Sequence, residues 1–126
     1  MIKGIGVDII EIARIEESLH MYGEAFSKKL FTAGETDYCR AKANPAQHFA
    51  ARFAAKEACS KALGTGWSGA FDWKLVEVLN DVSGKPAILL HGILAESLKD
   101  CDIHLSLSHS NVSVVAFVVI ESTLKD

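Results

Sequence analysis

The 126-residue sequence contains no apolar run that approaches the roughly 20 residues needed to span a bilayer. Its first residues, Met1 to Asp8, alternate glycine with apolar side chains and lack the long apolar region of a secretion signal. We therefore expect a cytoplasmic protein with no membrane partner. The chain is nevertheless 49% hydrophobic, and so many apolar side chains in so short a chain favour burial of part of the surface against further copies of the chain.

The sequence also lacks an excess of positive charge. It has 13 Lys and Arg against 16 Asp and Glu, a formal net charge of −3. Nucleic-acid binders usually carry a strong basic field, so we expect no nucleic-acid partner. An acidic protein partner would have to be met by a local basic patch.

Cysteines are few and widely spaced. Cys39, Cys59 and Cys101 are an odd number without C-x-x-C spacing, which argues against a disulfide framework and a zinc ribbon. We expect reduced, buried thiols. The histidines other than His109 show no metal-ligand spacing with each other or with the cysteines, so no zinc site is expected.

Hydrophobic periodicity predicts one α+β domain over residues 1–126, without linker or repeat. Strands are expected at 2–8, 71–79, 87–90, 103–108 and 113–120, and helices at 9–21, 24–31, 35–42, 46–63 and 93–98. Asp8 is expected at the end of the first strand. The last two strands are expected to form a buried hairpin.

The helix expected at 46–63 is rich in alanine and carries a group of polar side chains. These are Arg52, Lys56, Glu57, Ser60 and Lys61. Spacing of three to four residues predicts that the charges share one stripe, which leads to Gly64 and Gly66. Two interpretations stay open: a solvated helix face that ends in a glycine cap, or one wall of a phosphate site.

Two carboxylates and one histidine are further candidates. If Asp8 and Glu57 converge, they supply the hard oxygen ligands that Mg²⁺ takes from proteins; otherwise Asp8 is a turn or capping residue. His109 ends an apolar strand face and is either structural or exposed. Alternation along the strand places Ser108 and His109 on opposite faces, which argues against a Ser-His catalytic couple.

Four blocks of the sequence resemble one family, the holo-acyl-carrier-protein synthases of the 4′-phosphopantetheinyl transferase superfamily. The blocks are Gly4-Ile5-Gly6-Val7-Asp8-Ile9, Arg52-Phe53-Ala54-Ala55-Lys56-Glu57-Ala58 with Lys61-Ala62-Leu63-Gly64-Thr65-Gly66, Gly84-Lys85-Pro86, and Ser106-Leu107-Ser108-His109-Ser110. They occur in the family's order and span nearly the whole chain.

The resemblance implies an enzyme that transfers the 4′-phosphopantetheine arm of coenzyme A to a serine of apo acyl carrier protein in fatty acid biosynthesis. Adenosine 3′,5′-bisphosphate is released, and Mg²⁺ is the cofactor. The implied fold is an antiparallel sheet packed with a long helix. The implied assembly is a homotrimer with active sites between subunits.

The resemblance also implies roles for single residues. Asp8 and Glu57 would hold the metal, and these two with Lys61 would be catalytic. Either Glu57 or a metal-bound water would accept the serine proton. The implied coenzyme A contacts are Arg52, Lys61, Gly64, Thr65, Gly66, Lys85, Pro86 and His109. The implied carrier-protein contacts are Arg14, Lys28 and Lys29.

The identity of the carrier and two other classes of function stay open. Acidic residues such as Glu16 and Glu17 stand where the family has arginines, which leaves the identity of the carrier open. A non-catalytic coenzyme-binding module would keep the glycines and basic residues, although binding alone needs no carboxylate pair. A cysteine-dependent hydrolase would use Cys59 with a histidine.

Overall fold

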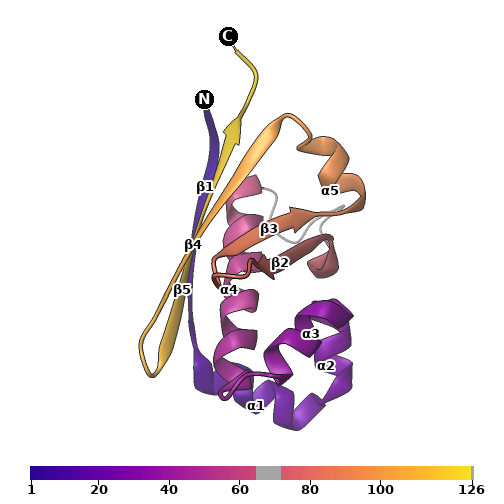
Figure 1. Ribbon diagram of the computed structural model, residues 1–126, viewed down its shortest axis with the longest axis vertical. Coiled ribbons are helices and arrows are strands. Elements are labelled where there is room, and N and C mark those ends of the chain that lie inside the picture. Colours follow the sequence, from indigo (N-terminus) through magenta and orange to yellow (C-terminus); the bar gives the residue numbers. More distant parts are fainter. Residues whose placement is uncertain (65–71, 126) are drawn as a thin grey trace.

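A three-stranded antiparallel sheet and one long helix form the centre of the computed structural model, which describes residues 1–64 and 72–125 (Figure 1). The sheet has the order β1-β5-β4, and a second sheet pairs β2 with β3. The strands are β1 (Ile2–Glu11), β2 (Val76–Asn80), β3 (Pro86–Leu90), β4 (Cys101–His109) and β5 (Ser113–Ser122). The helices are α1 (Ile12–Tyr22), α2 (Glu24–Leu30), α3 (Ala33–Arg40), α4 (Pro45–Leu63), the 3-10 turn η1 (Trp73–Leu75) and α5 (Gly92–Ser97). This confirms the predicted α+β class and antiparallel sheet.

Helix α4 begins and ends where the sequence predicts. The Asn44 side chain accepts a hydrogen bond from the backbone N–H of Gln47, and Pro45 occupies the first turn. Gly64 ends the helix with φ of 78°, the left-handed conformation that glycine adopts without a Cβ clash. None of the described helices is long and apolar enough to cross a membrane.

The predicted end of the first strand is wrong. Strand β1 continues past Asp8 to Glu11, which pairs with Ser113, so Asp8 lies within the strand opposite Ala116. The helix predicted to start at Ile9 therefore starts at Ile12. Ile9 and Ile10 pair with β5, and as β-branched residues they suit a strand, whereas the helical spacing of Ile12, Ile15 and Leu19 is confirmed in α1.

Two further predictions need correction. The strand predicted from residue 71 begins only at Val76, because Asp72 caps the turn η1 ahead of it; residue 71 itself lies outside the described residues. The closing hairpin is only half buried. The inner face of β5 is covered, whereas none of the described β4 residues is fully buried, because β4 is an edge strand.

The core lies between α4 and the inner face of the main sheet, with α1, α2 and α3 at one end of the helix (Figure 1). Alternate residues of β5 meet the alanines of α4 there, which keeps the helix close to the sheet. The hairpin β2–β3 lies on another side of α4 (Figure 1). The sheet's other face is open and apolar: Ile5, Val7 and Ile9 are all more than half exposed.

Two glycines bring β1 into backbone contact with α4. A Cβ on Gly4 would lie 1.9 Å from the carbonyl oxygen of Ala62, and one on Gly6 would lie 1.9 Å from that of Ala58. No side chain fits in either place. Because side chains alternate along a strand, Asp8 is the next residue to face the helix.

We predict that Gly6→Ala lowers the free energy of unfolding by about 1–3 kcal/mol or more, because the added methyl group meets backbone that cannot move aside. Denaturant unfolding monitored by circular dichroism measures this. Gly34→Ala is the matched control, since a Cβ there meets only ordinary contacts and alanine favours a helix. Equal stability of the Gly6→Ala and wild-type proteins would contradict the close contact.

Candidate active site

Three side chains gather where β1 passes α4. Asp8 faces the helix with 14% of its side chain exposed, and Lys61 Nζ lies 3.1 Å from Asp8 Oδ1. Lys61 also donates a hydrogen bond to the carbonyl oxygen of Val7 at 3.2 Å. Burial, and then the charge of Asp8, raise the pKa of Glu57, while Lys61 opposes this. The structure thus brings together the three residues predicted as catalytic.

The predicted charged stripe along α4 is wrong as a single surface. Glu57 and Lys61 reach solvent, but Arg52 is only 3% exposed and Lys56 is fully buried. These two cations point to the opposite side of the helix, toward α3 and β2. The helix was predicted correctly, but two of the four charged side chains in the predicted stripe, Arg52 and Lys56, are buried by other parts of the protein.

A buried carboxylate, Glu35, explains why the interior accepts the two cations. Glu35 Oε1 lies 2.8 Å from Lys56 Nζ, and Glu35 Oε2 lies 4.0 Å from Arg52 Nε. Lys56 also donates to the carbonyl oxygens of Trp73 and Val76. Burial lowers the pKa of Lys56, and Glu35 opposes that shift. Such contacts offset the desolvation of a buried ion pair.

Sequence reasoning missed Glu35, although the sequence carries a signal for it. The Thr32 side chain accepts from the N–H of Glu35, and Glu35 accepts from the N–H of Thr32. This is a capping box, the pattern T-x-x-E ahead of a helix, and it starts α3 two residues before the predicted position. Glu35 therefore caps α3 and neutralises cations of α4 at the same time.

A second group of predicted residues lines a pocket of about 380 Å³. Arg52, Lys85, Pro86 and His109 all face it, from α4, the β2–β3 turn and the end of β4. The pKa of His48, also in the lining, is lowered by burial and then by Arg52, Lys42 and His109. Arg52 and Lys85 are in the lining and no Asp or Glu is among its described residues, so the pocket is positively charged and suits phosphate groups.

Within one chain, the cluster of Asp8, Glu57 and Lys61 lies apart from the cationic pocket. Asp8, Glu57 and Lys61 are absent from the lining of the pocket. Gly64 caps α4 just beyond Lys61, whereas the predicted contacts Thr65 and Gly66 lie outside the described residues. Among the described residues, Lys61 and Gly64 therefore lie apart from the predicted coenzyme A contacts that line the pocket.

The predicted carrier-protein contacts lie on the outside of the helical end. Arg14 is exposed on α1, and Lys28 and Lys29 are exposed on α2. Lys28 forms an exposed ion pair with Glu24 at 3.2 Å. Such pairs contribute little, so Lys28 can exchange Glu24 for an acidic partner at small cost.

The cysteine-hydrolase interpretation is wrong. Cys59 is fully buried, and burial raises the pKa of its thiol to about 11. The thiolate is the nucleophile in such enzymes, and this site disfavours it. All three cysteines are free, as predicted; Cys39 and Cys59 are buried, and Cys101 is half-buried.

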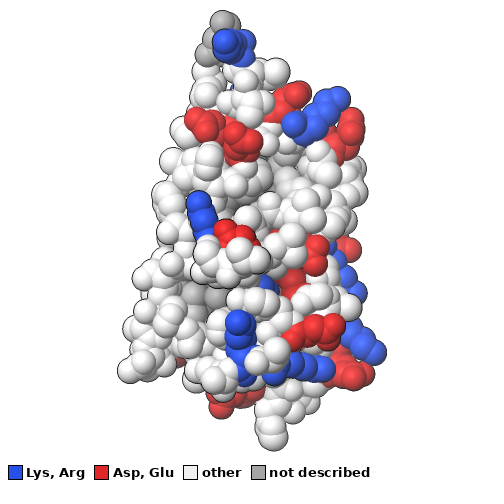
Figure 2. Space-filling view, in the orientation of Figure 1, with Lys and Arg blue, Asp and Glu red and all other residues white. Residues whose placement is uncertain are grey.

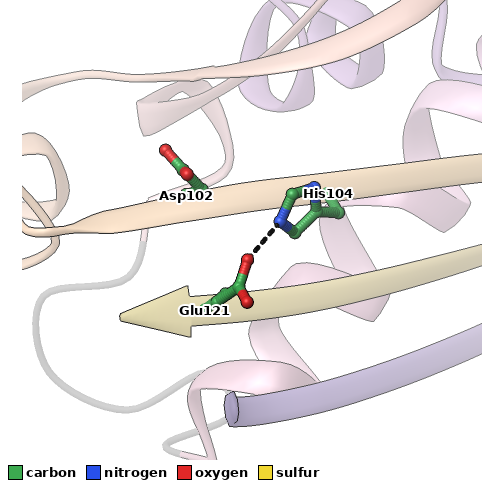
Figure 3. A group of neighbouring side chains, drawn as sticks. All are labelled: Asp102, His104 and Glu121. Carbon is green, nitrogen blue, oxygen red and sulfur yellow. Dashed lines mark hydrogen bonds and ion pairs between the residues drawn. The ribbon is translucent and has the colours of Figure 1, made fainter. Parts of the chain in front are cut away.

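One histidine does have acidic neighbours that its sequence spacing does not show. His104 Nε2 lies 3.0 Å from Glu121 Oε1 across the β4–β5 ladder, with Asp102 beside them (Figure 3). Strand register brings them together, so sequence spacing gives no sign of it. Asp102 and His104 are exposed, and the contact formed is a surface hydrogen bond between neighbouring strands.

A carboxylate pair beside a lysine, together with a positively charged pocket, suits a ligand that carries phosphate groups. The pattern of the 4′-phosphopantetheinyl transferase superfamily matches residues 4–118, and the chain belongs to this family. Its similarity to holo-acyl-carrier-protein synthases, predicted from the four sequence blocks, is confirmed.

Relatives match over nearly their whole length. The holo-[acyl-carrier-protein] synthase of Solibacter usitatus is 46% identical over 125 residues, which cover 97% of this chain and 100% of the relative. The crystal structure of the Neisseria meningitidis synthase has a TM-score of 0.88 at 36% identity, covering 97% of this chain and 100% of that one. The Bacillus anthracis synthase, solved in complex with CoA (3′,5′-ADP), has a TM-score of 0.82 at 40% identity, covering 97% and 98%.

We predict that Glu57→Gln stabilises the protein at neutral pH. The raised pKa means that the folded state binds the Glu57 proton more tightly than the unfolded state does. This contribution is present below pH 4.5, the ordinary pKa, and is lost as the pH rises through the raised pKa. Thermal unfolding between about pH 4 and pH 8 should show that the Glu57→Gln variant gains stability over the wild type at neutral pH and that the gain vanishes at acidic pH. Exposed Glu17→Gln is the control, and a gain that is the same at every pH would contradict the shift.

Proposed function

We propose that this chain transfers the 4′-phosphopantetheine group of coenzyme A to a serine of apo acyl carrier protein, as one domain of residues 1–126. The products are holo acyl carrier protein and adenosine 3′,5′-bisphosphate. The carrier serves fatty acid biosynthesis in the cytoplasm. The observation that carries the proposal is that Asp8 on β1 lies beside Glu57 and Lys61 on α4. The relatives of the chain are named holo-[acyl-carrier-protein] synthases.

The carboxylate pair fits Mg²⁺. Asp8 lies close enough to Glu57 for its charge to raise the pKa of Glu57, and a cation relieves such repulsion. Asp8 and Glu57 would hold the ion, which when bound supplies positive charge for the pyrophosphate oxygens. A module that only binds coenzyme A would not need this pair, which disfavours the non-catalytic alternative.

The residues of the chain account for the remaining steps. The serine hydroxyl of the carrier attacks the β-phosphorus of coenzyme A, a P–O bond forms, and the bond to the adenosine bisphosphate breaks. Glu57 accepts the serine proton as the general base. Lys61 is more than half exposed and reaches the developing negative charge from beside Asp8.

The cationic pocket binds the nucleotide part of coenzyme A. Arg52, Lys85 and His109 face its phosphates, with Pro86 against the rest of the nucleotide. Lys56 is paired with Glu35, and no Asp or Glu is among the described residues that line the pocket, so Arg52 and Lys85 keep it positive. Arg14, Lys28 and Lys29 receive the acidic carrier on the outside of α1 and α2.

A homotrimer completes the site. The outer face of the main sheet exposes Ile5, Val7, Ile9 and Phe117 side by side, and in Figure 2 the flank over the β4–β5 hairpin is free of charged side chains. Monomeric proteins rarely expose such a continuous apolar surface. In this trimer the apolar faces pack around a three-fold axis. The cationic pocket of one subunit then lies near Asp8 and Glu57 of its neighbour, and coenzyme A contacts both subunits.

We predict that Asp8→Asn and Glu57→Gln each reduce transfer about 100-fold or more, because each removes a metal ligand and the second also removes the base. Mass spectrometry of the carrier, which gains a phosphopantetheine group, measures the transfer. Circular dichroism should show both variants folded. Glu11→Gln, an exposed carboxylate at the end of the same strand, is the control. A near-normal rate from either variant would remove that residue from the metal site.

A further inference from the structure

Arg52 is held in the wall of the pocket by a ring contact, two hydrogen bonds and a longer ion pair with Glu35. Its guanidinium lies over the Tyr38 ring, 4.3 Å from the ring centre. Its Nη2 donates to Asn80 Oδ1 at 2.7 Å and to the carbonyl oxygen of Val78 at 3.4 Å. Its buried Nε has no hydrogen-bond partner among the described residues. The short bond to Asn80 is therefore the strongest directional contact that aims this side chain.

The other end of the same amide holds the turn between β2 and β3. Asn80 Nδ2 donates to the carbonyl oxygen of Gly84 at 3.0 Å. Gly84 has φ of 90°, and Asp81 accepts hydrogen bonds from Ser83 and Lys85 within the turn. One side chain thus connects the arginine on α4 to the turn that carries Lys85 into the pocket.

An amide suits this position for an electrostatic reason. Asn80 accepts a hydrogen bond from Arg52 without cancelling its positive charge, whereas a carboxylate would cancel it. Glu35 is already shared between Arg52 and Lys56. A neutral partner at position 80 therefore leaves the pocket positive toward phosphate groups.

We propose that Asn80 is a positioning residue for coenzyme A, which rests on the proposed function: it fixes Arg52 and the Gly84–Lys85 turn relative to each other. It acts on the affinity of the pocket for the nucleotide and not on the transfer step at Asp8 and Glu57. Asn80 has no place in the four sequence blocks, and only its contacts in the folded chain indicate the role.

The first test measures coenzyme A binding by calorimetry together with steady-state transfer. Asn80→Ala should raise both the Kd and the KM for coenzyme A about tenfold, the size of a lost hydrogen bond to a charged group, with kcat and the KM for the carrier within about twofold. Asn80→Asp, of nearly the same shape, should weaken binding further because it cancels the charge of Arg52. Val82→Ala, on the same turn with a fully exposed side chain, should match the wild type.

A double-mutant cycle separates positioning from mere support of the hairpin. If Asn80 acts through Arg52, adding Asn80→Ala to Arg52→Ala should cost much less affinity for coenzyme A than Asn80→Ala costs alone. Fully additive losses, or an Asn80→Asp variant that binds as tightly as the wild type, would overturn the inference alone. A wild-type protein that neither binds coenzyme A nor modifies the carrier would overturn the proposed function with it.

Discussion

The backbone contact between β1 and α4 is the constraint on which the rest of the structure depends. Gly4 and Gly6 leave no room for a side chain against the carbonyl oxygens of Ala62 and Ala58. This contact fixes the strand against the helix, and the strand's alternation then turns Asp8 toward Glu57 and Lys61. The approach of Asp8 to Glu57 thus depends on two glycines, which have no side chain to hold β1 away from α4.

Charge is divided between the two sides of α4. The side toward β1 carries Glu57 and Lys61 at the surface, and the side toward α3 buries Arg52 and Lys56 around Glu35. Arg52 and Lys85 make the pocket positive, whereas the carboxylates of Asp8 and Glu57 lie close together where β1 passes α4. A ligand with phosphate groups, bound together with a divalent cation, complements both sides.

Much of this architecture could be predicted from the sequence, and the errors have identifiable causes. The bounds of α4 were predicted correctly because Asn44 and Pro45 are strong local signals for a helix start and Gly64 is one for a helix end. The predicted end of β1 was wrong because the strand pairs with β5, which is distant in sequence, and this pairing continues past Asp8. Burial of Arg52 was missed because its partners lie on other elements, and a helical pattern does not reveal what covers each face.

Co-assembly of two inactive variants tests the shared site most directly. Asp8→Asn lacks one carboxylate of the pair, and a Lys85→Ala/His109→Ala variant lacks two polar side chains of the pocket. In the proposed homotrimer, random mixing of the two variants by co-expression should restore about a quarter of the wild-type transfer, because that fraction of sites combines two intact halves from different subunits. The account predicts this recovery of mass gain on the carrier. A mixture as inactive as the separate variants would contradict it and place both halves of the site in one chain.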